Sequence, residues 1–459
     1  MKNKNNLNKI SGFSDRFSDE LSFSNELDYK FFEFTTLWGY EKIETPIIEK
    51  SSIFSRKTGS TIGSNIYNFN DPSGLEVALR ADFTPSIMRS YLENEFAPNE
   101  MRFSYSGAIY KYDFETKKNY SRQNGVELIG NNNMYSDLEI IAMSKIFLSN
   151  VISNDIKISI GHVGILQDII KFFNLSERVG LFILQNLDYI KDENSSDQVL
   201  IKAEENGMIF HEDDSKHFSS NENDISKVLD VAFHKDSKFM QTRDKDSIIN
   251  GLMNKISNNS SKTKFIECLG VIKDLLHING DLEKSISGAN NLLSKVPTKN
   301  NLKNLYDLVN NLNCYEIDKS EVEINFGLVR EWGYYTGFVF NLTDSENQIF
   351  GGGGRYDSLG NSLGENLSAT GFAIDSEKII NSDSKSIDYN HHKKIIVYIK
   401  DEKDLKNAIN ACNEERSKGN IVSLKSSFDN LEDLNQWASK NEISEIIFFK
   451  NNNINRSEI

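Results

Sequence analysis

Cysteine and proline are scarce in this chain, and long apolar runs are missing. Its 459 residues include three cysteines and five prolines. Cys268, Cys314 and Cys412 are odd in number and far apart, so they predict neither a disulfide framework nor a metal cluster. No run approaches the roughly 20 apolar residues that a membrane span needs. We therefore expect a cytoplasmic protein without a membrane span, a metal or another cofactor.

The chain also lacks an excess of positive charge. Its net charge of −15 at pH 7 argues against broad nucleic-acid binding, because neutralising phosphates requires a basic face. The polar start, Met1–Asn6, is followed by no apolar stretch, so no signal peptide is expected. A hydrophobic content of 38% is sufficient for a core, and a chain of this length predicts two or three domains.

Local patterns predict an α+β fold in four parts. Two hairpins, at 66–79 and 101–130, indicate an antiparallel sheet, with helices expected at 27–38, from Thr84, and after Ser136-Asp137. Beyond a polar linker at 382–392, strands and helices alternate, which favours parallel strands. The expected parts are a core formed by 1–160 and 320–384, a mostly helical insertion at 161–319, and a small α/β module at 393–459.

The run Gly351–Gly354 is followed by Arg355-Tyr356-Asp357. Consecutive glycines are costly in entropy unless the backbone must approach something closely. Neither the phosphate-loop motif nor the dinucleotide motif fits the run. A flexible turn is one interpretation. The other is a ligand site, because a cation such as Arg355 beside accessible backbone suits a small anion.

Arg330 and the pair Tyr334-Tyr335 form a second candidate group. We expect these tyrosines in a strand at 334–342, where successive side chains alternate, so that only one faces a given pocket. A phenol offers a donor, an acceptor and a flat apolar face, which suits an imidazole. The alternative is that both tyrosines pack against a sheet and Arg330 lies at its rim.

A third group combines carboxylates with neutral acceptors. Gln123 and Glu127 share one strand face, and Gly125 between them leaves space. Asp82 and Thr84 also share a face. Such a site would suit an ammonium group and an imidazole N–H, while Arg330 could bind a carboxylate in bidentate fashion. Taken singly, each of these residues is more often a solvated charge on a strand.

Taken together, these blocks resemble the catalytic core of histidyl-tRNA synthetase, over roughly 8–150 and 320–382. The matching runs include Gly12–Asp15, Leu79–Thr84, Gln123–Gly130, Leu328–Thr336, Gly352–Asp357 and Gly371–Ile374. The resemblance implies a class II aminoacyl-tRNA synthetase-like antiparallel sheet and a histidine pocket. It implies that Asp82, Thr84 and Gln123 face the α-amino group, that Glu127 and Tyr334 lie near the imidazole, and that Arg330 lies near the carboxylate. Tyr335 is expected among the histidine-binding residues as well.

The residues that differ from the synthetase pattern lie mainly at positions that the resemblance assigns to ATP binding. The resemblance places Lys111 and Lys378 where arginines clamp phosphates, Asn119 where a second loop arginine stands, and Phe83 where glycine is usual. Lysine lacks the planar fork that grips two phosphate oxygens. Losing two clamps, at roughly 2–4 kcal/mol each, would slow adenylate formation on the order of 10³-fold or more. Binding histidine requires neither clamp.

The runs Leu79–Pro85, Phe103–Gly107 and Tyr334–Gly337 resemble the regulatory subunit of ATP phosphoribosyltransferase. This resemblance implies a subunit without catalysis of its own that activates a short-form catalytic subunit and conveys feedback by L-histidine. It also implies a homodimer formed around Pro46. The alternatives are a histidyl-tRNA synthetase with divergent ATP-binding motifs and a synthetase-derived RNA-interacting protein. The module at 393–459 is similar to an anticodon-binding domain, although it is short and not notably basic.

Overall fold

The computed structural model divides the chain into two compact units, Met1–Ile387 and Asp388–Ile459. The structure describes residues 9–55, 65–94, 100–112, 117–192, 195–210, 260–330, 333–382, 393–426, 428, 430–441, 443–450 and 453–459. Most of the expected linker at 382–392 and part of the expected insertion lie outside these residues. No helix among the described residues is long and apolar enough to cross a membrane. The expected limits of the four parts stay a prediction.

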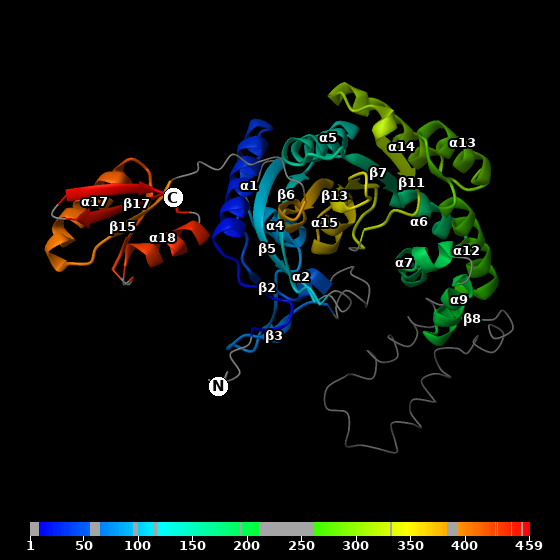
Figure 1. Ribbon diagram of the computed structural model, residues 1–459. Helices are drawn as coiled ribbons and strands as arrows, with labels where there is room; N and C mark the ends of the chain where they lie inside the picture. Colours follow the sequence, from blue (N-terminus) through cyan, green and yellow to red (C-terminus); the bar gives the residue numbers. More distant parts are fainter. Residues whose placement is uncertain are drawn as a thin grey trace, which may run out of the picture. The chain divides into compact units, whose positions relative to one another are not determined.

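The first unit is built on a nine-stranded sheet (Figure 1). In spatial order its strands are β1 (Glu41–Lys42), β5 (Met101–Tyr110), β6 (Tyr120–Ile129), β14 (Ala369–Asp375), β13 (Ile349–Arg355), β12 (Phe338–Thr343), β7 (Lys157–His162), β11 (Val322–Asn325) and β10 (Asn279–Gly280). The pairs β1–β5 and β7–β11 are parallel, and the other neighbours are antiparallel. The α+β class is confirmed, but the sheet is mixed rather than purely antiparallel.

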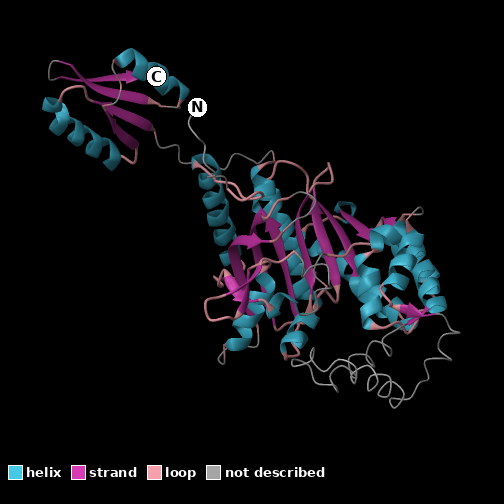
Figure 2. Cartoon of the chain, turned by 90° about the horizontal axis from the view of Figure 1, so that it is seen from below, coloured by secondary structure: helices cyan, strands magenta, loops and turns pink. Residues whose placement is uncertain are grey.

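Helices cover both faces of this sheet (Figure 2). One face carries α1 (Ser18–Leu37), α5 (Met134–Val151) and α16 (Ser376–Ile380), and the other carries α4 (Phe83–Glu93) and α15 (Asp357–Leu363). Alternation along β6 sorts its side chains between these faces. Val126 and Leu128 join the large apolar core with residues of α1 and α5, whereas Glu127 faces α4 and bonds Thr84.

The remaining elements of the first unit flank the sheet. The hairpin expected at 66–79 is confirmed as the antiparallel pair β3–β4, and β2 completes this small sheet. Its members and the other elements are β2 (Ile48–Lys50), α2 (Ser52–Ser55), β3 (Asn68–Asn70), β4 (Glu76–Leu79), α6 (Val163–Phe172), α7 (Glu177–Gln185), α8 (Leu187–Lys191), α9 (Ser196–Glu205), β8 (Ile209–Phe210), β9 (Ser260–Ser261), α12 (Lys262–Leu276), α13 (Leu282–Leu292), α14 (Lys299–Asn311), η2 (Leu312–Tyr315) and η3 (Lys319–Glu321).

The starts of two helices differ from the prediction. Asp82 caps α4, and its carboxylate accepts a hydrogen bond from the backbone N–H of Thr84 at 3.4 Å. Asn133, rather than Ser136, caps α5. Aspartate and asparagine are at least as good as serine or threonine at this position, since their side-chain oxygen reaches the free N–H groups of the first turn. The cap interaction holds the carboxylate of Asp82 between the end of β4 and the start of α4.

The glycine run is not a turn but the centre of β13. A Cβ on Gly351 would lie 2.4 Å from the carbonyl oxygen of Ala373, and one on Gly353 would lie 1.9 Å from that of Gly371. Both oxygens belong to the neighbouring strand β14. The glycines are therefore required by close approach of backbone to backbone within the sheet. The expectation of close approach was right, but its partner is a strand.

The second unit contains a four-stranded sheet in the order β16-β15-β17-β18, with one helix on each face. Its elements are β15 (Lys394–Tyr398), η4 (Glu402–Asp404), α17 (Leu405–Ser417), β16 (Ile421–Lys425), α18 (Leu431–Lys440), β17 (Glu445–Lys450) and β18 (Asn453–Glu458). The expected parallel pairing is confirmed for β15 with β16 and β17. The antiparallel edge strand β18 was not predicted.

Candidate functional site

A pocket lies on the face of the main sheet that α4 and α15 cover. Its volume of about 110 Å³ is several times the 10–15 Å³ or so that one water molecule needs. All seven residues predicted to bind histidine line it, together with one of the two predicted phosphate-site lysines. The lining consists of Ala81, Asp82, Thr84, Tyr105, Ile109, Lys111, Gln123, Glu127, Arg330, Tyr334, Tyr335, Gly352, Tyr356, Gly371, Phe372 and Ala373.

Three separate stretches of sequence supply the predicted ligand residues. Asp82 and Thr84 come from the start of α4, Gln123 and Glu127 from β6, and the other three from the connection between β11 and β12. The expectation that only one tyrosine can face the pocket is wrong. Tyr334 and Tyr335 precede the first residue of β12, Phe338, so strand alternation does not apply to them.

Two buried carboxylates form the polar centre of the pocket. Glu127 accepts hydrogen bonds from the hydroxyl of Thr84, at 2.5 Å, and from the hydroxyl of Tyr356. Asp82 accepts one from the hydroxyl of Tyr334, at 2.5 Å. Tyr356 was not among the predicted ligand residues. The glycine run in the sequence pointed instead to its neighbour Arg355 as the polar group beside the ligand.

Burial changes the acidity of both carboxyl groups. It raises the pKa of Glu127 from 4.5 to about 8, against the opposing hydrogen bonds from Thr84 and Tyr356. Burial also raises the pKa of Asp82, while the hydrogen bond from Tyr334 and the charge of Arg330 act in the opposite direction. A cationic or N–H donor group of a ligand would stabilise the charged form of the carboxylates, which burial disfavours.

Other polar groups remain available to a ligand. Within the described part of the chain, the side-chain oxygen of Gln123 is buried without a hydrogen-bond partner, although buried polar groups are normally satisfied. Arg330 donates to the side-chain oxygen of Asn341 at 2.7 Å, which ties it to β12 at the pocket wall. Burial raises the pKa of Tyr335 to about 12, while Arg330 opposes this shift. The pocket thus combines carboxylates, an amide acceptor and a guanidinium group.

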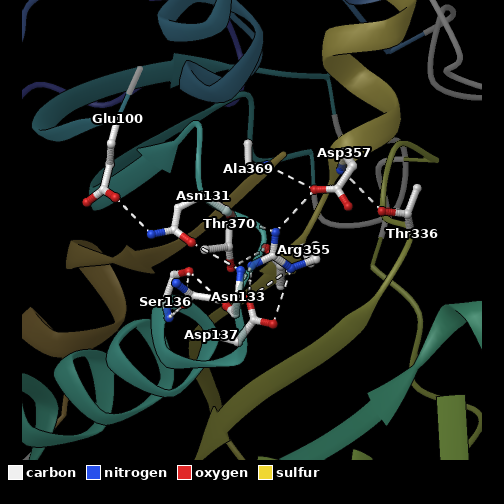
Figure 3. A network of polar contacts seen from close by, with 11 residues as sticks. Glu100, Asn131, Asn133, Ser136, Asp137, Thr336, Arg355, Asp357, Ala369 and Thr370 are labelled. Atoms are coloured by element: carbon white, nitrogen blue, oxygen red, sulfur yellow. Dashed lines mark hydrogen bonds and ion pairs between the residues drawn. The ribbon is translucent and has the colours of Figure 1, made fainter. Parts of the chain in front are cut away.

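Arg355 does not serve as the anion-binding cation that the glycine run suggested. Its guanidinium donates to Asp137, with Nε 3.0 Å from Oδ1, and to the carbonyl oxygen of Asn131 at 3.1 Å (Figure 3). It also lies 3.3 Å from a carboxylate oxygen of Asp357. Arg355 is absent from the pocket lining. The residue joins β13 to the first turns of α5 and α15, so its function there is structural.

Of the two lysines at positions where the resemblance expects phosphate-binding arginines, one lies in the pocket lining and the other does not. Lys111 lines the pocket. Lys378 does not, and its ammonium group donates to the carbonyl oxygen of Ile349 at 2.7 Å. Asn119 is 2% exposed and donates through Nδ2 to the carbonyl oxygen of Ser11 at 2.9 Å. The amide of Asn119 is therefore used within the fold.

Sequence comparison identifies the family to which these motifs belong. The family described as histidyl-tRNA synthetase matches residues 12–202 and 239–379. The chain belongs to the histidyl-tRNA synthetase family. The histidine–tRNA ligase of Sulfurisphaera tokodaii is 29% identical over 424 residues, which cover 90% of this chain and 84% of the relative. That of Pyrococcus abyssi is 27% identical over 384 residues, covering 82% and 74%.

Solved structures of this family share the fold. One is described as an ATP phosphoribosyltransferase regulatory subunit/histidyl-tRNA synthetase from Bacillus halodurans, with a TM-score of 0.67 and 20% identity over 98% of this chain and 99% of the other. The histidyl-tRNA synthetase from Nostoc sp. PCC 7120 has a TM-score of 0.63 and 15% identity over 99% and 97%. The predicted class II synthetase-like architecture, with a small C-terminal module, is thereby confirmed.

Proposed function

We propose that this chain is a regulatory subunit of ATP phosphoribosyltransferase that binds L-histidine and performs no catalysis of its own. One observation carries the proposal. The pocket contains every residue predicted to bind the amino acid, whereas lysines replace the expected arginines at the two phosphate clamps and Lys378 lies outside the pocket lining. The site is therefore equipped to hold histidine but poorly equipped to activate it.

The chemistry of the pocket matches the three polar groups of histidine. Asp82 and the unpartnered oxygen of Gln123 suit the α-ammonium group. Glu127 suits an imidazole N–H, since a buried carboxylate is stabilised by a positioned donor. Arg330 suits the α-carboxylate, which a guanidinium can bind through two parallel hydrogen bonds.

The same pocket offers little to a triphosphate. Lys111 presents a single ammonium group where a guanidinium fork would hold two phosphate oxygens. The bond from Lys378 to the carbonyl of Ile349 directs the second cation toward the protein. Adenylate formation depends on positioned charge in the transition state, so both features oppose it.

Regulation would then follow from differential affinity. If histidine binds one arrangement of the subunits more tightly than another, it shifts the assembly toward that arrangement. The proposed partners are a short-form catalytic subunit and a second copy of this chain joined around Pro46. The buried position of Glu127 makes it the residue through which the ligand would most directly affect this equilibrium.

Reconstitution tests the proposal. The purified chain is mixed with a short-form catalytic subunit, and formation of phosphoribosyl-ATP is measured with and without histidine. We expect the chain to raise the activity and histidine to lower it. Glu127→Ala should blunt the inhibition and leave most of the activation. No activation, or equal histidine sensitivity in the variant and the parent, would contradict the assignment.

A histidyl-tRNA synthetase with divergent ATP-binding motifs is the second candidate. The curated relatives described above are histidine–tRNA ligases, and they support this alternative. A synthetase must catalyse histidine-dependent exchange of pyrophosphate with ATP. Exchange at ordinary synthetase rates would favour this candidate over the regulatory subunit. Salt-sensitive RNA binding without exchange or activation would instead indicate an RNA-interacting protein.

A further inference from the structure

A stack of three side chains supports one wall of the pocket. The ring of Phe83 lies flat on that of Tyr105, with centroids 4.3 Å apart and planes inclined by 20°. The guanidinium carbon of Arg80 lies 3.8 Å from the centre of the Phe83 ring, so the two side chains form a cation–π contact. Of the three, only Tyr105 lines the pocket.

Both ends of this stack are fixed. Arg80 donates to the carbonyl oxygen of Thr45 at 2.7 Å and to that of Ala108 at 3.0 Å. Arg80, Phe83 and Tyr105 are at most 4% exposed. The stack therefore has little freedom to move, and the ring of Tyr105 is held from behind by a ring that never contacts the pocket itself.

Two glycines on adjacent strands make room for the stack. A Cβ on Gly107 would lie 2.9 Å from Cζ of Phe83 and 3.2 Å from Nη2 of Arg80. A Cβ on Gly125 would lie 2.3 Å from the hydroxyl oxygen of Tyr105. Tyr105 pairs with Gly125 across β5 and β6, so its phenol lies across the neighbouring strand. The space at Gly125 is thus filled by Tyr105 and is not open to a ligand.

We propose that Phe83 is a positioning residue that holds Tyr105 as a rigid wall and thereby limits the pocket to an amino acid with a side chain no larger than an imidazole ring. The inference rests on the proposed histidine function and deepens it. Phe83 acts only through Tyr105. Without the Phe83 ring, Tyr105 could tilt into the vacated space above Gly107, and the pocket would become wider.

The ratio of two affinities measures this effect. Binding of histidine and of tryptophan, which has a larger planar side chain, is measured by calorimetry on the full chain. In Phe83→Leu we expect the preference for histidine over tryptophan to fall about tenfold, the scale on which apolar pockets discriminate by size. Phe265→Leu is the matched control, because Phe265 is a fully buried residue of α12 outside the pocket lining. It should keep the parent ratio even if its melting temperature falls equally.

Variants of Tyr105 distinguish the effect of its aromatic ring on selectivity from the effect of its hydroxyl group. Tyr105→Phe keeps the ring and should keep the parent ratio, whereas Tyr105→Leu should lower it as Phe83→Leu does. The double variant Phe83→Leu/Tyr105→Leu should be no less selective than Tyr105→Leu alone, since Phe83 would have no ring left to hold.

The possible outcomes distinguish the two proposals. If the parent binds histidine and Phe83→Leu keeps its preference, the inference about Phe83 is overturned and the proposed function stands. If the loss of selectivity in the double variant is the sum of the single losses, Phe83 does not act through Tyr105 and the inference is equally overturned. If the parent binds no histidine, the proposed function fails and the inference fails with it.

Discussion

Two clusters of charged residues in the first unit differ in how their charges are balanced. In the first, Asp137 faces the guanidinium of Arg355, which also contacts Asp357 (Figure 3). In the second, Asp82 and Glu127 are met by the hydroxyl groups of threonine and tyrosine. The first cluster contains its own counter-charge, while the second lines a cavity.

The contrast separates a structural ion pair from the proposed ligand site. A buried charge requires a partner, because removing it from water is costly. Arg355 supplies that partner to Asp137 within the fold, and the pair joins a strand to two helices. The carboxylate of Glu127 receives only neutral donors in the described structure. A cationic group of a ligand would therefore stabilise its charged form.

Breaking the paired cluster should have the largest effect. In Arg355→Ala the carboxylate of Asp137, which is mostly shielded from solvent, would lose its cation, and we expect a loss of roughly 3–5 kcal/mol in the free energy of unfolding. Urea unfolding followed by circular dichroism measures it. As a control, Lys403→Ala removes an exposed ion pair with Asp401 and should leave the midpoint unchanged. A parent-like midpoint for Arg355→Ala would show that the pair is not structural.

The second cluster, Asp82 and Glu127, should make the stability of the protein depend on pH. The folded state raises the pKa of Glu127 from 4.5 to about 8, so it binds this proton more tightly than the unfolded chain does. Its contribution is complete below pH 4.5 and is lost as pH rises to about 8, a change of roughly 5 kcal/mol. In the ligand-free parent, the urea midpoint should fall more steeply over this range than in Glu127→Gln. Parallel curves would refute the shift.

The same substitution should weaken ligand binding. Glu127→Gln keeps the shape of the side chain but loses its charge, and a hydrogen bond to a charged group contributes roughly 1.5–3 kcal/mol. We expect histidine to bind about 10–100-fold more weakly in calorimetry. Asp137→Asn, in the paired cluster, should lower stability and leave the affinity near that of the parent. If both variants lost affinity equally, the two clusters would not be functionally distinct.

The smallest effect is expected at Lys378. Its ammonium group donates to the carbonyl of Ile349, outside the pocket lining. Lys378→Ala should therefore change the affinity for histidine by less than about twofold, within the range of surface substitutions. Calorimetry under the conditions used for Glu127→Gln provides the measurement. A fivefold loss would mean that Lys378 contributes to the amino-acid site after all.

Sequence reasoning recovered much of the site and missed particular parts of it. It found Gln123 and Glu127, because alternation along a strand is a local property. It did not find Tyr356 or the wall residue Tyr105, since each meets its partners across strands that are distant in sequence. It also expected Tyr334 and Tyr335 on opposite faces, although both line the pocket. The edge strand β10 was missed for the same reason, since helices separate it along the chain from its partner β11, whereas β18 was missed although it pairs with the preceding strand β17.

The amino-acid order by itself determined the family, the residue types of the pocket and their grouping into three blocks, because motif spacing and side-chain periodicity are encoded locally. Only the tertiary structure decided which charges face the cavity. Arg330 lines it while Arg355 faces Asp137, and Lys111 lines it while Lys378 bonds Ile349. A charged side chain takes the partner that folding brings within reach, and in this protein those partners come from distant segments of the chain.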